Sequence, residues 1–299
     1  MHDGEVDTSP VLVRQLLAGQ FPHWAGLPLK RVASAGTDHA IYRFGDNKAV
    51  RLPRIGWATG QAMKEMHWLP RLARHLPLAL PEPLALGQPD AGYPWPWSVY
   101  RWLPGQNATI DTLTNPTATA VALAHFLTAL QQIDTTDGPQ AAEHGLRGRP
   151  LLTRDKATRD AIAALPASFD AAVLTAIWEA ALQATEWDRP PVWFHGDVLP
   201  GNLLFENGRL TAIIDFGGLG VGDPACDLMI AWNLFTAEGR AVLRQALAVD
   251  DATWARGRGH ALAQAVIFIP YYLETNPVGV AYARRAIAEI VAEWQGQSG

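Results

Sequence analysis

The pattern of hydrophobic and polar positions divides this chain into two parts of different texture. Between residues 29 and 102, short runs of alternating apolar and polar residues are separated by turn signals such as Gly45-Asp46-Asn47, which predicts an antiparallel sheet. These runs are LKRVAS, HAIYRFG, KAVRLP, EPLALG and WSVYRW. One helix is predicted among them, over GQAMKEMHWLPRLARHL, because apolar residues recur there at three-residue steps. The recurring residues are Met63, Met66, Leu69 and Leu72.

After LPGQNA the chain becomes rich in alanine and leucine, which predicts a helical part. The predicted helices span Thr117 to Gln132, Asp155 to Ala164, Ala171 to Trp187 and Ala237 to Leu247, with two more near the C-terminus. No repeat with a period of 20 to 50 residues is present. The pattern therefore predicts an α+β fold, in which a sheet-rich part precedes a larger and mainly helical part.

One strand-like island interrupts the helical part. VWFH and NLLF flank a loop with Asp197 and Asn202, and the turn ENGR leads into a partner strand, LTAIID, that ends at Asp215. Because a hairpin brings its flanks together, we expect Asp197, Asn202 and Asp215 to converge at one end of a small sheet. Carboxylate and amide oxygens are ligands that Mg²⁺ prefers, usually together with substrate phosphates. The island therefore predicts a magnesium site.

Composition and charge narrow the class of protein. A chain of 299 residues with 48% hydrophobic residues can bury a large core. Its net charge is -5 and its basic residues are scattered, which argues against nucleic acid as a partner. The single cysteine, Cys226, fits a reducing compartment. No secretory signal opens the chain, and the apolar stretch from Ala261 to Leu273 is shorter than the roughly 20 residues of a membrane span. We expect a soluble, cytoplasmic protein with no membrane partner.

The order of motifs in the island resembles that of the protein-kinase-like superfamily. Kinases place an aspartate and an asparagine five residues apart in the catalytic loop, and a later Asp-Phe-Gly element holds metal. Here the corresponding residues are His195-Gly196-Asp197, Asn202 and Asp215-Phe216-Gly217. The HGD sequence, with GDPACDL after the second element, is similar to the aminoglycoside phosphotransferase and choline kinase branch, and most similar to the aminoglycoside phosphotransferase family. The resemblance extends over nearly the whole chain.

This resemblance implies a fold and a set of roles. The fold is a bilobal, protein-kinase-like one, with an N-terminal antiparallel sheet lobe at residues 1–101 and a larger, mainly helical C-terminal lobe at residues 102–299. Asp197 would be the catalytic base that orients the acceptor hydroxyl, while Asn202 and Asp215 would hold Mg²⁺. We interpret His195 as a structural residue beneath the loop, which Asp227 would buttress. Taken alone, each aspartate is equally explained as a loop or capping carboxylate.

The sheet lobe should then bind the nucleotide, either ATP or GTP. Alternation in KAVRLP places Ala49 and Arg51 on one face, so Arg51 stands where such enzymes commonly have lysine. Glu65, on the following helix, is its expected partner. An arginine binds phosphate through a planar fork, unlike the compact ammonium of lysine. The alternative is that Arg51 is a surface strand residue and Glu65 part of a solvated helix face.

Further nucleotide contacts are expected from two connecting segments. The segment SAGTDHA has the position of the phosphate-covering loop, so Ser34, Thr37 and nearby backbone amides are candidate phosphate donors, although only one glycine is present. The segment SVYRWLPG has the position of the inter-lobe hinge, where backbone groups from Tyr100 to Trp102 are candidates to bind a purine.

The hydroxylated small-molecule acceptor is the least constrained part. Candidate acceptor residues lie on helices that follow the metal element: Trp232, Asn233, Glu238, Tyr271, Tyr272 and Glu274. Acidic residues suit a polycationic aminoglycoside, whereas the aromatic residues equally suit a macrolide, and a small amino-alcohol or sugar stays open. A catalytically weak nucleotide-binding protein and a metal-dependent phosphohydrolase are the alternatives from other classes. The oligomeric state and the choice of antibiotic or cellular metabolite stay open.

Overall fold

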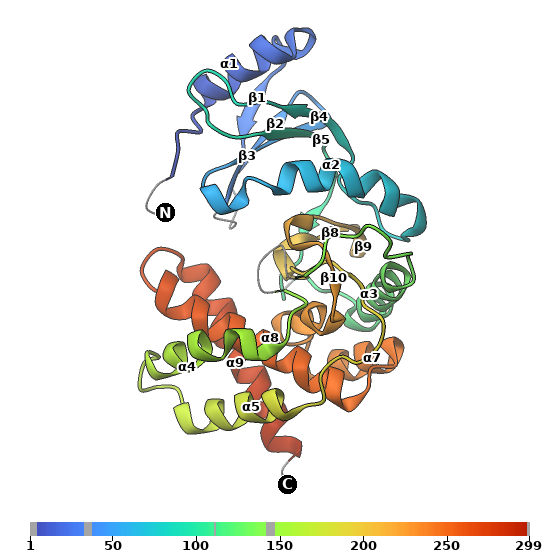
Figure 1. The fold of residues 1–299 in the computed structure, drawn as a ribbon, viewed down its shortest axis with the longest axis vertical. Helices are drawn as coiled ribbons and strands as arrows, with labels where there is room; N and C mark the ends of the chain where they lie inside the picture. The colour runs from blue at the N-terminus through green and yellow to red at the C-terminus, as the bar shows by residue number, and fades with distance from the viewer. Residues whose placement is uncertain (1–4, 33–37, 111, 142–146, 298–299) are drawn as a thin grey trace. The chain divides into compact units, whose positions relative to one another are not determined.

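The computed structural model describes residues 5–110, 112–141 and 147–297, with a gap at 33–37 (Figure 1). Contacts between Cα atoms divide the chain into two compact units. The first unit comprises the described parts of Met1–Arg74, Leu78–Gly105 and Ala212–Gly217. The second unit comprises the described parts of His75–Pro77, Gln106–Thr211 and Gly218–Gly299. The Asp-Phe-Gly element therefore belongs to the first unit, and the HGD loop belongs to the second.

A five-stranded antiparallel sheet, in the order β1-β2-β3-β5-β4, forms the centre of the first unit. Its strands are β1 (Leu29–Arg31), β2 (His39–Phe44), β3 (Lys48–Pro53), β4 (Pro83–Gly87) and β5 (Trp97–Arg101). All five had been expected from the sequence pattern. The sheet and the helix-rich second unit confirm the predicted α+β class.

Two helices lie on opposite sides of this sheet (Figure 1). Helix α1 (Pro10–Gln20) was not among the predicted elements. It is capped by Ser9 and packs Leu12, Val13, Leu16 and Leu17 in one core cluster with β2, β3 and β5. The strand residues of that cluster include Tyr42, Phe44, Val50 and Val99. Helix α2 (Gln61–Leu72) meets the opposite face, to which Arg51 points.

The predicted apolar face of α2 is wrong at its first position. Met63 is 59% exposed, whereas Glu65 is 1% exposed and lies on the buried side with Ala62, Leu69 and Leu72. Charged side chains are seldom buried unless they are paired. The burial of Glu65 is therefore explained by its partner on the sheet rather than by helix periodicity.

Helices dominate the second unit. They are α3 (Pro116–Gln131), α4 (Asp155–Ala163), α5 (Ala171–Gln183), α6 (Ile230–Asn233), α7 (Ala237–Leu247), α8 (Asp251–Tyr272) and α9 (Pro277–Gln297). Helix α8 packs against α4, α5 and α9, and Trp178, Trp193 and Trp232 are fully buried in the surrounding core. Helix α5 ends at Gln183, before the predicted end at Trp187. In the part of the chain that the structure describes, no helix is both long and apolar enough to cross a membrane.

The island expected from the sequence forms short strands. They are β7 (Val192–Phe194), β8 (Leu203–Glu206), β9 (Arg209–Ile213) and β10 (Gly220–Gly222), with β6 (Gln106–Asn107) beside β8. Strands β8 and β9 are neighbours in one sheet, and β7 pairs with β10 in another. Asn207 and Gly208 have φ angles of 51° and 74°, the left-handed conformation that an Asn-Gly hairpin turn requires. The predicted hairpin is confirmed.

Candidate active site

An ion pair between strand β3 and helix α2 organises the candidate site of the first unit. Arg51 Nη1 donates to both oxygens of Glu65, at 2.7 and 2.8 Å. The side chains are 12% and 1% exposed, so the pair is nearly withdrawn from water. Strand alternation explains the geometry, because Val50 and Leu52 enter the core on one face while Arg51 projects from the other. The expected pairing of Arg51 with Glu65 is present in the structure.

The second terminal nitrogen of Arg51 reaches the Asp-Phe-Gly element. Arg51 Nη2 lies 2.5 Å from Asp215 Oδ1, 3.2 Å from Gln61 Oε1 and 3.3 Å from His39 Nδ1. Burial alone lowers the pKa of Arg51, but Asp215 and Glu65 together raise it above its ordinary value, which keeps the guanidinium charged. Asp215 has a φ angle of 65°, a conformation that costs a non-glycine residue energy and is often found at functional sites.

Two further side chains surround this network. Tyr100 on β5 lies opposite Ala49 on β3, and its hydroxyl donates to Glu65. Burial and the Glu65 carboxylate together raise the pKa of Tyr100. Lys64 Nζ donates to the carbonyl of Gly217 at 2.6 Å, and burial lowers the pKa of Lys64 to about 8. Sequence reasoning had missed Lys64, although its position next to Glu65 was a usable signal.

Two backbone N–H groups of the predicted hinge, SVYRWLPG, already have hydrogen-bond partners within the protein. The backbone N–H of Trp102 donates to Asn47 at 2.8 Å, and that of Arg101 donates to Glu82 at 2.8 Å. These two donors therefore have protein partners, and binding of a purine by the other backbone groups from Tyr100 to Trp102 stays a prediction. The Trp102 ring lies beneath the Arg43 guanidinium, 5.3 Å away. The other nucleotide candidates, Ser34 and Thr37, lie outside the described residues.

A buried carboxylate holds the HGD loop of the second unit. Asp227 accepts the backbone N–H of His195 at 2.8 Å and that of Gly196 at 2.7 Å. Burial raises the pKa of Asp227 to about 7, although both hydrogen bonds act in the other direction. His195 is fully buried, and its Nδ1 accepts the backbone N–H of Asp197 at 3.1 Å. Both side chains thus support the loop backbone from within the core.

Asp197 and Asn202 are joined in the same loop. Asn202 Nδ2 donates to the Asp197 carbonyl at 2.8 Å and to its carboxylate at 3.1 Å. The amide oxygen of Asn202 is the atom left to face a cation. Arg147 Nη2 donates to the Asp197 carboxylate at 3.0 Å, a long-range ion pair that no local sequence signal indicates. Gly196 has a φ angle of 84°, and an added Cβ would lie 2.3 Å from the Gly218 carbonyl oxygen.

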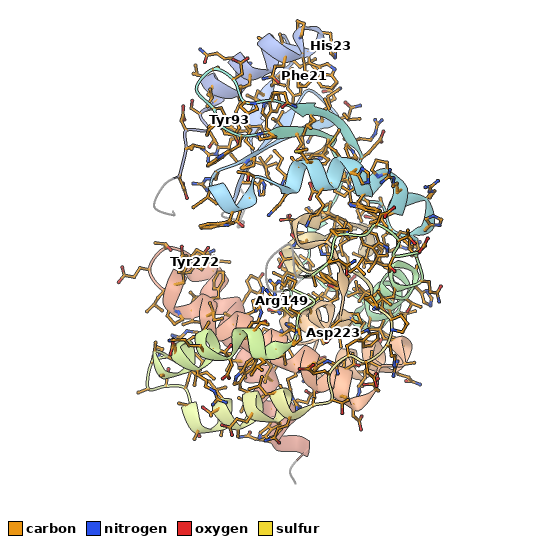
Figure 2. The ribbon with its side chains drawn as sticks, viewed as in Figure 1. Phe21, His23, Tyr93, Arg149, Asp223 and Tyr272 are labelled. Atoms are coloured by element: carbon orange, nitrogen blue, oxygen red, sulfur yellow. The ribbon has the colours of Figure 1, made fainter. Side chains whose placement is uncertain are left out.

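The predicted acceptor residues fall into two groups. Trp232 is fully buried, with its indole N–H donating to Glu293 at 3.1 Å, and Asn233 is 9% exposed and donates to the Met229 carbonyl. Both are packed inside the second unit, so the expectation that they face an acceptor is wrong for this structure. Glu238, Tyr271 and Glu274 are exposed. Tyr272 lies at the end of α8, with its ring 4.6 Å from that of Tyr271 (Figure 2).

Asp223, the other aspartate of GDPACDL, is labelled in Figure 2. Its carboxylate accepts the N–H of Ala225 and pairs with Arg256 at 2.7 Å. Asp223 thus caps the turn that follows it, and Asp227 is a buried acceptor of backbone hydrogen bonds, so both aspartates have structural roles. No group of three or more His, Cys, Asp or Glu side chains in the described ranges is arranged to hold a metal ion. Of the expected magnesium ligands, Asn202 is an amide in the second unit and Asp215 is a carboxylate in the first unit, so their convergence stays a prediction.

Comparison with known sequences gives one family and two curated relatives. The model of the phosphotransferase enzyme family matches residues 30–260, well over half of the chain. Aminoglycoside 3'-phosphotransferases of Escherichia coli and Salmonella typhimurium are each 35% identical to this chain over 57 residues. That match covers 19% of this chain and 21% of each relative, so the chain spans about a fifth of the curated relatives that it matches.

Solved structures resemble the chain over nearly its whole length. The GDP and kanamycin complex of APH(2")-IIia has a TM-score of 0.75 at 19% identity, and covers 92% of this chain and 98% of its own. The GDP complex of wild-type aminoglycoside 2'-phosphotransferase-IIIa has a TM-score of 0.74 at 17% identity, with 94% and 99% covered. Macrolide 2'-phosphotransferase MphH from Brachybacterium faecium has a TM-score of 0.59 at 26% identity, with 94% and 98% covered. These likenesses confirm the predicted fold.

Proposed function

The chain belongs to the phosphotransferase enzyme family, and on that premise we propose that it transfers the terminal phosphate of a nucleoside triphosphate to a hydroxyl group of an aminoglycoside-like acceptor. One observation carries the proposal: Arg51 contacts both Glu65 and Asp215. Phosphoryl transfer of the kinase type needs a basic residue on the third strand, an acidic partner on the next helix and a metal-binding aspartate. All three lie together within the first unit.

Arg51 is the residue that we assign to the nucleotide phosphates. Its guanidinium stays charged at all working pH values, and the Nη2 donor that now serves Asp215 would turn to a phosphate oxygen when Asp215 binds the metal. Glu65 fixes one edge and is itself held by the Tyr100 hydroxyl. Several of the related structures are GDP or ADP complexes, which supports a nucleotide as the second substrate.

Asp197 is the residue that we assign to the acceptor hydroxyl. Its carboxylate is 30% exposed, and the contacts from Arg147 and Asn202 fix its orientation. A carboxylate held in this way would align the hydroxyl and accept its proton as the new P–O bond forms and the P–O bond to the departing nucleoside diphosphate breaks. Most of the rate enhancement in such a reaction comes from positioning and charge stabilisation.

Two side chains of this chain carry oxygen donors of the kind that Mg²⁺ prefers. Asp215 supplies a carboxylate that is 42% exposed, and Asn202 supplies an amide oxygen, because its Nδ2 is already used in donating to Asp197. Hard oxygen donors of this kind, completed by phosphates and water, are the usual Mg²⁺ environment. A bound Mg²⁺ would neutralise charge on the terminal phosphates.

The acceptor is a hydroxylated antibiotic in this proposal, which would make the protein a resistance enzyme. Aminoglycosides are favoured by the curated relatives and by several of the related structures. A macrolide is the second candidate, because a macrolide phosphotransferase is 26% identical over nearly the whole chain. Large apolar side chains are also exposed around the end of α8 and the start of α9, namely Ile267, Tyr271, Leu273 and Val278.

A turnover screen tests the proposal. The purified chain is incubated with Mg²⁺ and either ATP or GTP, in the presence of aminoglycosides, macrolides or small amino-alcohols, and nucleoside diphosphate release is measured. We expect release that depends on one acceptor class and yields a phosphorylated acceptor by mass spectrometry. Phosphate release without any acceptor would indicate a phosphohydrolase instead. Nucleotide binding without turnover would indicate a kinase-like binding protein.

A further inference from the structure

His39 opens strand β2 on the sheet face that carries Arg51. In the β2–β3 register Ile41 lies opposite Arg51, so His39, two residues away, projects on the same side as Arg51. Its Nδ1 lies 3.3 Å from Arg51 Nη2. The other face of this strand is different, since Ala40, Tyr42 and Phe44 enter the core. His39 is therefore not a core-filling residue, and the contact with Arg51 is what its position provides.

The chemistry of the two side chains fixes the tautomer of His39. An arginine has only donors and is never deprotonated in proteins, so the histidine nitrogen that faces it must accept. His39 is consequently neutral, with its proton on Nε2. Burial and the Arg51 charge also hold the pKa of His39 well below its usual value.

Arg51 needs more acceptors than a lysine at the same position. Its Nη1 is saturated by the two Glu65 oxygens, while its Nη2 is shared by Asp215, Gln61 and His39. Asp215 is the proposed metal ligand, so its carboxylate has a second task when substrate is bound. The neutral acceptors His39 and Gln61 have no such competing task, and they continue to define the plane of the guanidinium.

We propose that His39 is a positioning residue that holds the Nη2 edge of Arg51, so that an arginine performs the phosphate-binding task commonly given to lysine. This inference rests on the proposed function, because the ligand of Arg51 is taken to be the nucleotide phosphates. His39 acts through Arg51 and forms no bond to the reacting atoms. The contributions of Arg51 and His39 to nucleotide affinity should therefore be coupled. Once Arg51 is replaced, replacing His39 should cause no further loss of affinity.

Three variants test this coupling. His39→Asn keeps an acceptor near the position of Nδ1, His39→Leu removes it, and Arg51→Lys shortens the donor so that it no longer spans to His39. We expect His39→Leu to raise the nucleotide Kd and KM by about tenfold, the effect of losing one hydrogen bond to a charged group, with little change in kcat. His39→Asn should recover most of the affinity. In the Arg51→Lys background, His39→Leu should have no further effect.

Controls separate positioning from folding. His23→Leu replaces an exposed histidine of the same unit and should leave the nucleotide Kd unchanged. Circular dichroism and urea unfolding show whether each variant is folded. Equal losses of affinity from His39→Leu in the wild-type background and in the Arg51→Lys background, with a folded protein, would overturn the inference. So would a His39→Asn variant that binds nucleotide as weakly as His39→Leu.

The same measurements keep the two proposals apart. A wild-type chain that binds nucleotide but transfers no phosphate overturns the proposed function alone, because nucleotide affinities still report the coupling of His39 to Arg51. A chain that transfers phosphate normally while its His39 variants bind nucleotide normally overturns the inference alone. A wild-type chain that binds no nucleotide overturns both.

Discussion

At the scale of single residues, Asp197 is the side chain on which the proposed reaction depends most directly. Replacing it with asparagine keeps its size but removes the charge that accepts the hydroxyl proton. We expect Asp197→Asn to lower kcat by about 10² to 10⁴, the usual contribution of a positioned base, while the nucleotide Kd stays the same. Steady-state kinetics and calorimetry measure the two quantities. Asp188→Asn, at an exposed site of the same unit, is the control, and an active Asp197→Asn would exclude the residue as base.

Glu65 shows how one residue supports stability and binding together. It is 1% exposed and accepts from Arg51 and Tyr100, so removing its charge leaves the Arg51 guanidinium buried with only Asp215 opposite. Breaking a buried pair by removing one partner costs about 3 to 5 kcal/mol. We predict that Glu65→Gln lowers the free energy of unfolding by about 3 kcal/mol, measured in urea. A change below about 1 kcal/mol would contradict the assigned pairing.

Tyr100→Phe should lower the free energy of unfolding less than Glu65→Gln does. It removes only the hydroxyl that donates to Glu65, and the loss of one hydrogen bond to a charged group should cost about 1 to 3 kcal/mol. Urea unfolding of both single variants and of the double variant measures the coupling. Additive effects would show that the Tyr100 hydroxyl does not act through Glu65.

At the scale of elements, the HGD loop depends on close approach of two backbones. An alanine at Gly196 would place its Cβ 2.3 Å from the Gly218 carbonyl oxygen, at a position whose φ angle is 84°. We predict that Gly196→Ala destabilises the protein by about 1 to 3 kcal/mol and lowers kcat, because Asp197 follows directly. Gly201→Ala is the matched control for stability, since nothing lies within 4 Å of its Cβ. Thermal unfolding that is equal in both variants would contradict this explanation.

Much of the fold follows from local sequence signals. Strand alternation correctly separates Arg51 from Val50, and the Asn207-Gly208 pair correctly indicates the hairpin, because each signal is carried by neighbouring residues. The signals for α1 were also local, with Ser9 as cap, Pro10 at the first position and a leucine stripe after it.

The errors have a different origin, since they involve partners far away in the sequence. Periodicity placed Met63 on the buried face of α2, whereas Glu65 is buried there because Arg51, on another element, compensates its charge. Trp232 resembles a ligand-facing aromatic in the sequence, yet Glu293 on α9 accepts its indole N–H in the core. Arg147 meets Asp197 across 50 positions. The partners of Trp232 and Arg147 are set by tertiary packing, which a single sequence does not reveal, whereas the family resemblance had indicated the partner of Glu65.

At the scale of the whole molecule, buried histidines make stability depend on pH. Burial, with nearby arginines, holds the pKa of His260 well below its ordinary value of 6.5. The unfolded chain takes up that proton below about pH 6.5 and the folded chain does not, so stability is present above that pH and declines as pH falls. The slope approaches about 1.4 kcal/mol per pH unit for one group.

The contribution of His260 is isolated by replacing it. We predict that His260→Gln has a flatter dependence of unfolding free energy on pH between about 6.5 and 5 than the wild type. His23→Gln, at an exposed site, should leave the dependence unchanged. Comparing variants also separates His260 from Asp227, whose pKa is raised to about 7 and whose effect has the opposite sign. Parallel curves for wild type and His260→Gln would contradict the prediction.

Ligand binding should stabilise the whole chain in proportion to its affinity. A nucleotide at about a hundred times its Kd adds about 2.7 kcal/mol to the free energy of unfolding, which appears as a higher Tm. If Asp215 and Asn202 hold Mg²⁺, removing the metal with EDTA should reduce that gain in the wild type and change little in Asp215→Ala. Arg51→Ala should lose this nucleotide-dependent increase in Tm both with and without metal, because Arg51 is proposed to contact the phosphates directly. An equal Tm increase in Mg²⁺ and in EDTA for the wild type would exclude Asp215 and Asn202 as ligands of a metal–nucleotide complex.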